Sequence, residues 1–268
     1  MTSSLLAQFF PVFSLTSQLL STSDKSFWHG YLNFYERLLP KEINGTILEF
    51  GVFRGNSIRW LMQTFPTACI LGADILATQP EWPVDPRVTY YQLDQGDEEA
   101  VRNLLTNIVD LDLIVEDGSH LPLHQSICLK HGLDVLRPGG TYVLEDIHTS
   151  HPAHELYRHE FGSERGQTAF SVLLGIEHLR RIEAENDDER LETLARGSHF
   201  TGDEIRNLAE QIDTVEFYRR ATLPASCWNC GSSHFNYNEL RCQCGVELFS
   251  EADSMTIVIR KRRSDAAR

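Results

Sequence analysis

TILEFGVFRGNS, residues 46–57, joins a short apolar strand to a glycine turn and the start of a helix. Gly51 and Gly55 stand four positions apart, and the helix-like run SIRWLMQTF follows them directly. Glycines in such a turn let the backbone approach a ligand at the carboxyl end of the strand. Their spacing differs from the GxGxxG spacing of dinucleotide-binding folds. The stretch therefore predicts the first strand, turn and helix of an α/β sheet, with a ligand site at the turn.

Further apolar segments of strand length recur along the chain, with helix-like stretches between them. Strands that alternate with helices in this way are typical of a parallel, doubly wound sheet. We therefore predict an α/β fold with a Rossmann-like sheet of seven strands. The later strands are expected at 68–75, 88–94, 111–119, 141–147, 214–221 and 255–262.

The chain divides into a helical beginning and a long α/β core. Residues 1–40 read as an N-terminal helical segment, because apolar residues recur at helical spacing and Pro40 ends the pattern. Residues 41–268 are expected to form the core. Within the core, a cysteine-rich insertion at 221–252 separates the last two strands.

Composition excludes some partners. The 268 residues carry a formal net charge of −14, which disfavours binding to nucleic acid because that needs cations facing phosphates. No apolar run reaches the length of a membrane span, and the apolar start lacks the cationic region of a signal peptide. We expect a cytoplasmic protein with a small-molecule partner, no nucleic acid and no membrane; homo-oligomerisation stays open.

Three successive strand ends carry polar groups suited to a nucleoside. Asp74 ends the second strand, 25 residues after Glu49, where a carboxylate can accept hydrogen bonds from ribose hydroxyls. A helix cap is the alternative role for Asp74. The third strand ends at Asp94 and Gln95, whose side chains suit an adenine edge. Ser57 is placed to help start the helix after the glycine turn.

The order of these motifs resembles that of S-adenosylmethionine-dependent methyltransferases of class I. It is similar in particular to the metal-dependent sugar O-methyltransferases of macrolide biosynthesis (mycinamicin and macrocin type) and to cephalosporin-hydroxylase-like proteins. The upstream segment TSDKSFWHGYLNFYE also resembles that group, and the likeness covers roughly residues 22–150. The motifs that carry it are LEFGVFRGNS, GADI, QLDQGD, VEDGSH and LRPGGTYVLEDIHTS.

The resemblance implies a fold, a cofactor and the residues that hold it. In such a sheet the sixth strand is parallel to the first five and the last strand is antiparallel. The cofactor would be S-adenosylmethionine, bound at the carboxyl ends of the first strands. The residues expected to bind it are Glu49, Gly51, Gly55, Ser57, Asp74, Asp94, Gln95 and Asp117.

Acidic residues and a histidine follow the fourth and fifth strands. Asp117 and His120 follow one, and Glu145 and Asp146 follow the other, so they meet if the two strands pair. Carboxylates in one crevice repel each other unless a cation lies between them, and oxygen ligands favour Mg²⁺ or a similar ion. We expect Asp117, Glu145 and Asp146 to hold the metal, and His120 with Asp117 to be catalytic. Glu116 stands where the related group usually has aspartate.

Four cysteines cluster near the end of the chain. Cys227, Cys230, Cys242 and Cys244 can supply four thiolates to one tetrahedral, structural Zn²⁺. His234 is a substitute ligand in this scheme, and free thiols are the alternative. Cys69 and Cys128 lie in apolar stretches and are expected in the core.

The function expected from all these features is O-methylation of a small molecule's hydroxyl. A sugar or polyol in natural-product tailoring is the acceptor that the resemblance implies. Two alternatives stay open: methylation of a phenol or a nitrogen, and a non-catalytic protein that binds S-adenosylmethionine.

Overall fold

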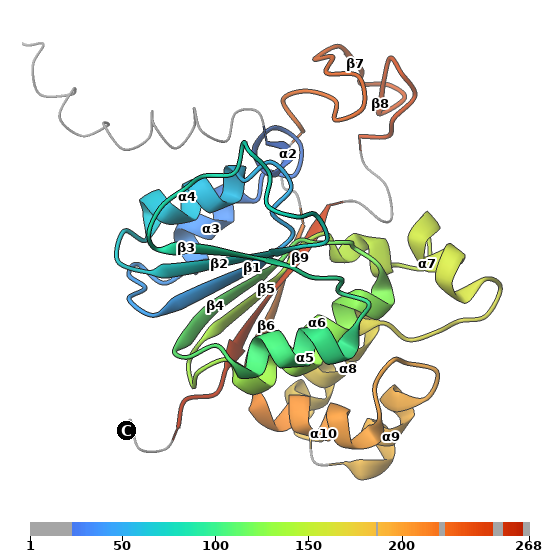
Figure 1. Ribbon diagram of the computed structural model, residues 1–268. Coiled ribbons are helices and arrows are strands. Elements are labelled where there is room, and N and C mark those ends of the chain that lie inside the picture. Colours follow the sequence, from blue (N-terminus) through green and yellow to red (C-terminus); the bar gives the residue numbers. More distant parts are fainter. Residues whose placement is uncertain (1–22, 186, 220–222, 249–253, 265–268) are drawn as a thin grey trace, which may run out of the picture.

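The computed structural model describes residues 23–185, 187–219, 223–248 and 254–264. It contains a seven-stranded sheet with the order β3-β2-β1-β4-β5-β9-β6 (Figure 1). All strand pairs from β3 to β5 are parallel, and β9 is antiparallel to both β5 and β6. The predicted doubly wound sheet with an antiparallel last strand is thereby confirmed. The strands are β1 Thr46–Phe50, β2 Cys69–Asp74, β3 Val88–Gln92, β4 Leu111–Glu116, β5 Thr141–Leu144, β6 Ile212–Arg219 and β9 Met255–Lys261.

Helices cover both faces of the sheet (Figure 1). The helices on one face are α3 (Leu32–Leu38) and α4 (Asn56–Thr64). The other face carries α5 (Glu98–Thr106), α6 (Pro122–Val135), α8 (Ala169–Arg181) and α10 (Gly202–Gln211). The remaining helical elements are α2 Asp24–Phe27, α7 Glu155–Phe161, α9 Asp188–Ala195 and the 3₁₀ turn η1 Ile147–Ser150.

Alternation along β1 divides its side chains between two apolar clusters. Leu48 and Phe50 pack against the α5–α6 face, whereas Ile47 packs against the α3–α4 face. This is the two-residue period of a strand buried on both sides. Glu49 points to the same face as Ile47 and is completely buried, so a carboxylate lies inside the core directly below the glycine turn.

The order in which strands are added to the sheet reverses between β1 and β4. From β1 the chain continues to β2 and β3 on one side, and β4 and β5 then extend the sheet on the other side. The ends of neighbouring parallel strands separate at such a switch point, and ligands of open α/β sheets bind there. The fold therefore places its ligand crevice at the carboxyl ends of β1 and β4.

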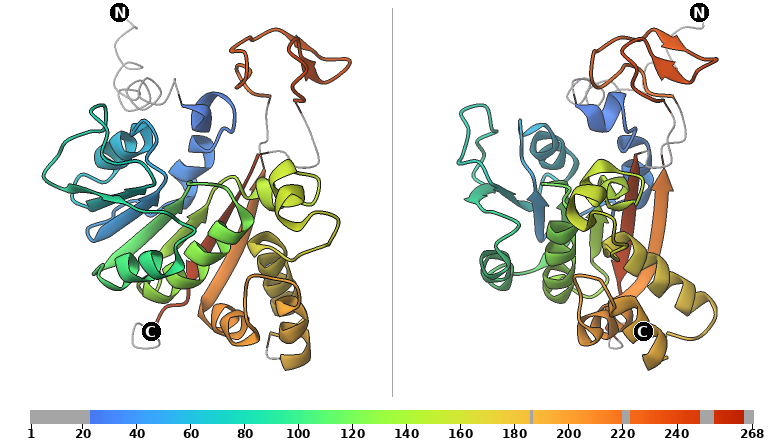
Figure 2. Two further views of the ribbon diagram at one scale, coloured as in Figure 1. Left: turned by 45° about the vertical axis from the view of Figure 1, so that its right-hand side comes forward. Right: turned by 90° about the vertical axis from the view of Figure 1, so that its right-hand side faces the viewer.

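The cysteine-rich insertion lies beyond the carboxyl end of β6, next to α2 (Figure 2). Its described part, residues 223–248, contains one small two-stranded sheet, β7 (Phe235–Asn236) with β8 (Arg241–Cys242). No helix of the described residues is long and apolar enough to cross a membrane.

Some local expectations need correction or lie outside the described residues. Cys69 is exposed at the start of β2, so its prediction as a core thiol was wrong, whereas Cys128 is buried as expected. Although β2 lies between β3 and β1, Cys69 is its first residue and stands at the amino end of the sheet, where the strand begins at the surface. The helical segment expected up to Pro40 forms α2 and α3 in its described part, and residues 1–22 lie outside the described residues.

Candidate active site

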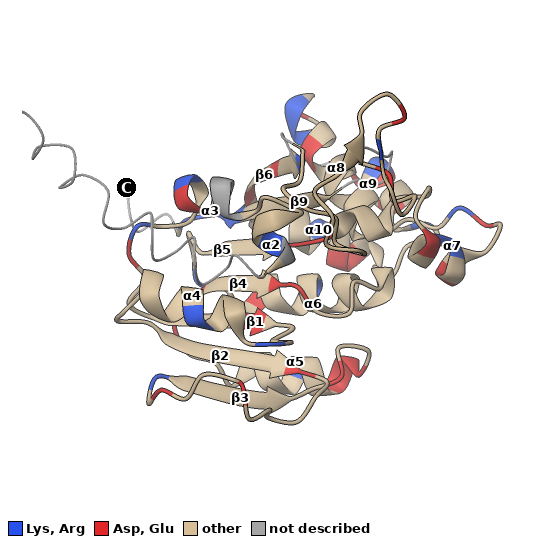
Figure 3. Cartoon of the chain, turned by 90° about the horizontal axis from the view of Figure 1, so that it is seen from above, with Lys and Arg blue, Asp and Glu red and all other residues tan. Residues whose placement is uncertain are grey.

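A cavity of about 500 Å³ opens at the carboxyl ends of the central strands. This volume is in the range of small-molecule and cofactor sites. Figure 3 shows the molecule from above, with acidic positions at the ends of β1 and β4 and a basic position of α2 near them. Of the residues expected to bind a ligand here, those that line the cavity are Gly51, Asp74, Asp94, Gln95, Asp117, His120, Glu145 and Asp146. Those that do not line it are Glu49, Gly55 and Ser57.

The glycine turn brings two backbone segments into contact. Gly51 has a φ of +88°, and a Cβ atom added to it would lie 2.0 Å from the carbonyl oxygen of Asp117. The amide of Asp117 in turn donates to the carbonyl of Phe50, at 2.9 Å. Only glycine combines this φ with so close an approach, because it has no Cβ atom. The turn after β1 and the segment after β4 therefore form one wall of the cavity.

Replacing Gly51 with alanine should lower the free energy of unfolding by about 1–3 kcal/mol, because both the positive φ and the added Cβ strain the backbone. Denaturation by urea would measure the loss. Gly197 is a matched control, since its φ is +71° and a Cβ there meets nothing within 4 Å. Gly197→Ala should cost less than Gly51→Ala; equal losses would show that the contact with Asp117 adds nothing.

Asp74 ties the glycine turn to the end of β2. Its Oδ2 accepts hydrogen bonds from the amides of Val52 (2.7 Å) and Phe53 (2.9 Å), and its Oδ1 accepts one from the amide of Leu76 (2.9 Å). The carboxylate also lines the cavity. Asp74 is thus placed to shape the turn and to face a ligand. Its alternative role as a helix cap was wrong, because Val52 and Phe53 precede α4 and no described helix begins at Leu76.

Gln95 joins the ends of β3 and β4. Its Nε2 donates to Glu116 Oε1 at 2.7 Å, and its Oε1 accepts from the amide of Ser119 at 2.8 Å. Glu116 is buried and does not line the cavity. Burial raises the pKa of Glu116 to about 7, although the hydrogen bond from Gln95 opposes the rise. Glu116, which stands where the related methyltransferases usually have aspartate, therefore lies beneath the cavity and does not line it.

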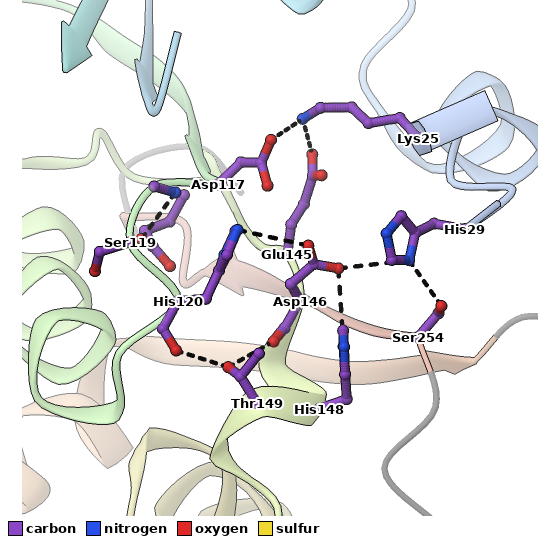
Figure 4. Close-up of polar contacts among 12 residues, drawn as sticks. Lys25, His29, Asp117, Ser119, His120, Glu145, Asp146, His148, Thr149 and Ser254 are labelled. Atoms are coloured by element: carbon purple, nitrogen blue, oxygen red, sulfur yellow. Dashed lines mark hydrogen bonds and ion pairs between the residues drawn. The ribbon is translucent and has the colours of Figure 1, made fainter. Parts of the chain in front are cut away.

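Asp117, His120 and Asp146 converge in the cavity (Figure 4). One potential ligand atom from each lies within 4.8 Å of the others, and His120 Nε2 is 3.7 Å from Asp146 Oδ2. They meet because β4 and β5 are paired, with Glu116 opposite Leu144. Two carboxylates and an imidazole suit a divalent cation. His120 Nδ1 is buried and makes no hydrogen bond with the described residues.

Asp146 is surrounded by proton donors. Its Oδ1 accepts a hydrogen bond from the hydroxyl of Tyr31 and lies 3.6 Å from His29 Nδ1 and 3.8 Å from His148 Nδ1. Burial alone would raise the pKa of Asp146, but the three histidines and Tyr31 outweigh burial and lower it. The carboxylate therefore stays ionised, as a metal ligand or an orienting group for His120 must.

Lys25, on α2, forms ion pairs with three carboxylates. Its Nζ lies 2.7 Å from Asp117 Oδ2, 2.8 Å from Glu145 Oε1 and 3.6 Å from Glu49 Oε1. Burial alone would lower the pKa of Lys25, but the three carboxylates outweigh it and raise the pKa. Glu145, expected as a metal ligand, is paired here with Lys25 and also accepts from the hydroxyl of Tyr35.

Glu49 and Ser57 lie beneath the cavity. They share a small neighbouring space with Lys25 and Tyr35. Burial raises the pKa of Glu49 to about 7, and Lys25 opposes the rise. Both residues therefore lie below the floor of the site, in a space that they share with Lys25 and Glu145.

Three of the six non-glycine residues with a positive φ in the described part of the chain line the cavity. Phe53, His120 and Asp146 have φ values of +48°, +58° and +49°, and all three line the cavity. A non-glycine residue in this region costs of order 1–3 kcal/mol and is kept mainly at functional sites. The strain is a second indication, independent of the acids, that this crevice is the functional site.

Tyr31 and Tyr35 are site residues that sequence reasoning missed. Tyr31 belongs to the segment expected to be helical because of its apolar residues, and its ring is buried. Both hydroxyls, however, donate to the acids after β5. The signal was their spacing of four residues, which puts two hydroxyls on one side of a helical turn.

No family model matches this chain. A curated relative, the 8-demethyl-8-α-L-rhamnosyl tetracenomycin-C 2′-O-methyltransferase of Streptomyces olivaceus, is 31% identical over 138 residues, which are 48% of this chain and 36% of the relative. The mycinamicin VI 2″-O-methyltransferase of Micromonospora griseorubida is 30% identical over 151 residues, 53% of this chain and 37% of the relative. The chain thus spans little more than a third of the length of these relatives.

Solved structures show the same fold. The MycE methyltransferase of the mycinamycin biosynthetic pathway, in complex with Mg, SAH and mycinamycin VI, superposes with a TM-score of 0.59 at 19% identity. The match covers 94% of this chain and 56% of MycE. The chain therefore has the fold of class I S-adenosylmethionine-dependent methyltransferases, and in sequence it resembles the sugar O-methyltransferases of the mycinamicin, tetracenomycin and macrocin type.

Proposed function

We propose that this chain is an S-adenosylmethionine-dependent O-methyltransferase that acts on a hydroxyl of a small molecule, of the sugar or polyol class. The observation that carries the proposal is the convergence of Asp117, His120 and Asp146 in a cavity bounded by the glycine turn and Asp74. The names of the relatives support the acceptor class, since all are O-methyltransferases and two of the names contain a sugar residue, rhamnosyl or olivosyl, in the acceptor.

The cofactor would lie on the side of the cavity formed by β1, β2 and β3. Gly51, Asp74, Asp94 and Gln95 line that side. Asp74 presents a carboxylate to ribose hydroxyls, and the glycine turn leaves room for the cofactor next to the backbone. The residues after β4 and β5 would then face the acceptor, so the two substrates meet at the switch point of the sheet.

The chemistry requires an aligned acceptor oxygen and a place for its proton. A divalent ion of the Mg²⁺ type, bound by Asp117 and Asp146, would lower the pKa of the acceptor hydroxyl. His120 would take the hydroxyl proton, while the oxygen forms its bond to the methyl group and the sulfonium sulfur keeps the electrons of the broken bond. Asp146, 3.7 Å from His120 Nε2, would stabilise the resulting imidazolium. The side chains contribute mainly by holding these groups in line.

The experiment that tests the proposal is calorimetric titration of S-adenosylmethionine into the purified chain, with and without Mg²⁺, followed by mass spectrometry of a panel of glycosides and polyols. Binding with transfer of one methyl group to a hydroxyl is expected. Binding without transfer to any acceptor in the presence of Mg²⁺ would favour a non-catalytic binding protein, and transfer to amines alone would contradict the oxygen acceptor.

Asp74→Ala should weaken the binding of S-adenosylmethionine by about 1–3 kcal/mol, because ribose hydroxyls would lose a buried acceptor. Calorimetry measures the change directly. Asp203→Ala is the matched control, since Asp203 is exposed on α10 and pairs with Arg206. Unchanged affinity in Asp74→Ala would contradict a role in cofactor binding and would assign Asp74 to the structure of the glycine turn alone.

A further inference from the structure

The cysteine insertion is built around four sulfur atoms. The Sγ atoms of Cys227, Cys230, Cys242 and Cys244 all lie within 4.8 Å of one another. Cys227 Sγ is 3.6 Å from Cys244 Sγ, and Cys230 Sγ is 3.5 Å from Cys242 Sγ. Zinc bonds of about 2.3 Å in a tetrahedron separate the sulfurs by about 3.8 Å. Disulfides would instead join the cysteines in pairs at about 2.05 Å.

The backbone around the cysteines forms two matching turns. Gly231 donates to the carbonyl of Cys227, and Gly245 donates to that of Cys242, both at 2.8 Å. Both glycines have positive φ values, 68° and 94°. Each turn bends the chain back so that a cysteine at either end faces the same point. Two such turns facing each other are a frame for one tetrahedral ion.

The insertion has almost no apolar core of its own. Among residues 223–248 the buried side chains are Pro224, Cys227, Cys242 and Leu248. Its only regular structure among the described residues is the sheet of β7 and β8, which pairs two residues from each strand. A segment of this size needs a metal or a cross-link to hold one conformation. Four thiolates favour zinc, whose binding free energy would then be folding free energy.

The start of the insertion and the residue before β9 both contact the segment that carries Lys25. On the way in, the amide of Ala225 donates to the carbonyl of Phe27 at 2.8 Å. After the insertion, directly before β9, Ser254 Oγ lies 2.7 Å from His29 Nδ1 and is buried (Figure 4). His29 in turn faces Asp146, and Lys25 pairs with Asp117 and Glu145. The insertion is therefore attached through Ala225 to α2, the element that carries Lys25.

We propose that Cys227, Cys230, Cys242 and Cys244 bind one structural zinc ion, and that this ion fixes the insertion as a brace for residues 25–31. The aromatic side chains of the insertion do not line the cavity: Trp228 and Tyr237 are exposed, and the described residues that line it all belong to other segments. The insertion thus acts through α2 and not by direct contact with an acceptor.

The metal is tested first, on the full chain purified without chelator. Elemental analysis should find zinc equimolar with protein, and a mercurial reagent should release it. Cys230→Ser and Cys244→Ser should each lower zinc content about tenfold or more, since a missing thiolate breaks the tetrahedron. Cys69→Ser and His234→Ala are matched controls that should keep zinc. Iron in place of zinc, zinc retained by both serine variants, or disulfides in reduced protein would overturn the site.

The brace is tested by hydrogen exchange, which does not depend on methyl transfer. Removing zinc, or Cys244→Ser, should speed amide exchange at least several-fold both in the insertion and in residues 25–31. The Cys69→Ser protein should exchange like the original chain. Faster exchange confined to the insertion would overturn the brace while leaving the zinc site intact.

Discussion

Asp146→Asn is expected to reduce methyl transfer by about a thousandfold, since a lost divalent ion removes several kcal/mol of stabilisation from the transition state. Asp146 contacts the other residues proposed to act in catalysis. It lies near Asp117 and His120 and accepts a hydrogen bond from the hydroxyl of Tyr31. Asparagine keeps the size of aspartate and tolerates the φ of +49° found here. The loss should therefore come from the missing charge and not from a distorted backbone.

Initial rates and S-adenosylmethionine affinity measured on the same protein separate this effect from misfolding. Affinity should stay within about threefold of the original, because Asp146 lies away from the glycine turn and Asp74. Chelator should abolish turnover of the original chain and Mg²⁺ alone should restore it, which separates this ion from the zinc of the insertion. Asp134→Asn is the control, since Asp134 accepts from Asn207 and Gln211 on the surface. Full turnover by metal-free protein in excess chelator would rule out the metal role.

Sequence alone predicted the sheet and much of the site for one physical reason. Parallel neighbouring strands end at the same edge, so polar residues directly after strands must gather there. Asp117 and Asp146 are brought together by the pairing of β4 with β5, which the strand pattern implied. Gly51 was identifiable because a turn that touches another backbone accepts no side chain.

What sequence could not give is the packing of segments that are distant along the chain. Lys25 and Glu145 are separated by 120 residues, and their hydrogen bond depends on how α2 docks on the sheet. No local pattern encodes that docking, so Glu145 was assigned to the metal from its place after β5 alone. Glu49 and Ser57 illustrate the same difficulty: they belong to the glycine-turn motif, yet β1 turns Glu49 into the core below the cavity.

His120→Asn should lower the turnover number by about 10²–10⁴-fold while the affinity for S-adenosylmethionine holds, because the variant loses the group that takes the acceptor proton. His120 lies 3.7 Å from Asp146 Oδ2, and its φ is +58°. Burial alone would lower the pKa of His120, but Asp146, Asp117 and Glu116 outweigh burial and raise it. Asparagine accepts a positive φ, so this variant removes the imidazole with little change in backbone strain.

His120→Gly separates chemistry from stability at the same position. Glycine relieves the left-handed backbone, so this variant should unfold at an equal or higher urea concentration than His120→Asn, although both are catalytically impaired. A higher urea concentration for His120→Gly would show that a side chain at this position strains the backbone. His131→Asn is the matched control, since His131 lies on α6, bonds Glu98 and does not line the cavity. A wild-type rate in His120→Asn would exclude the general base, and a matching loss in His131→Asn would trace the effect to α6 and not to the site.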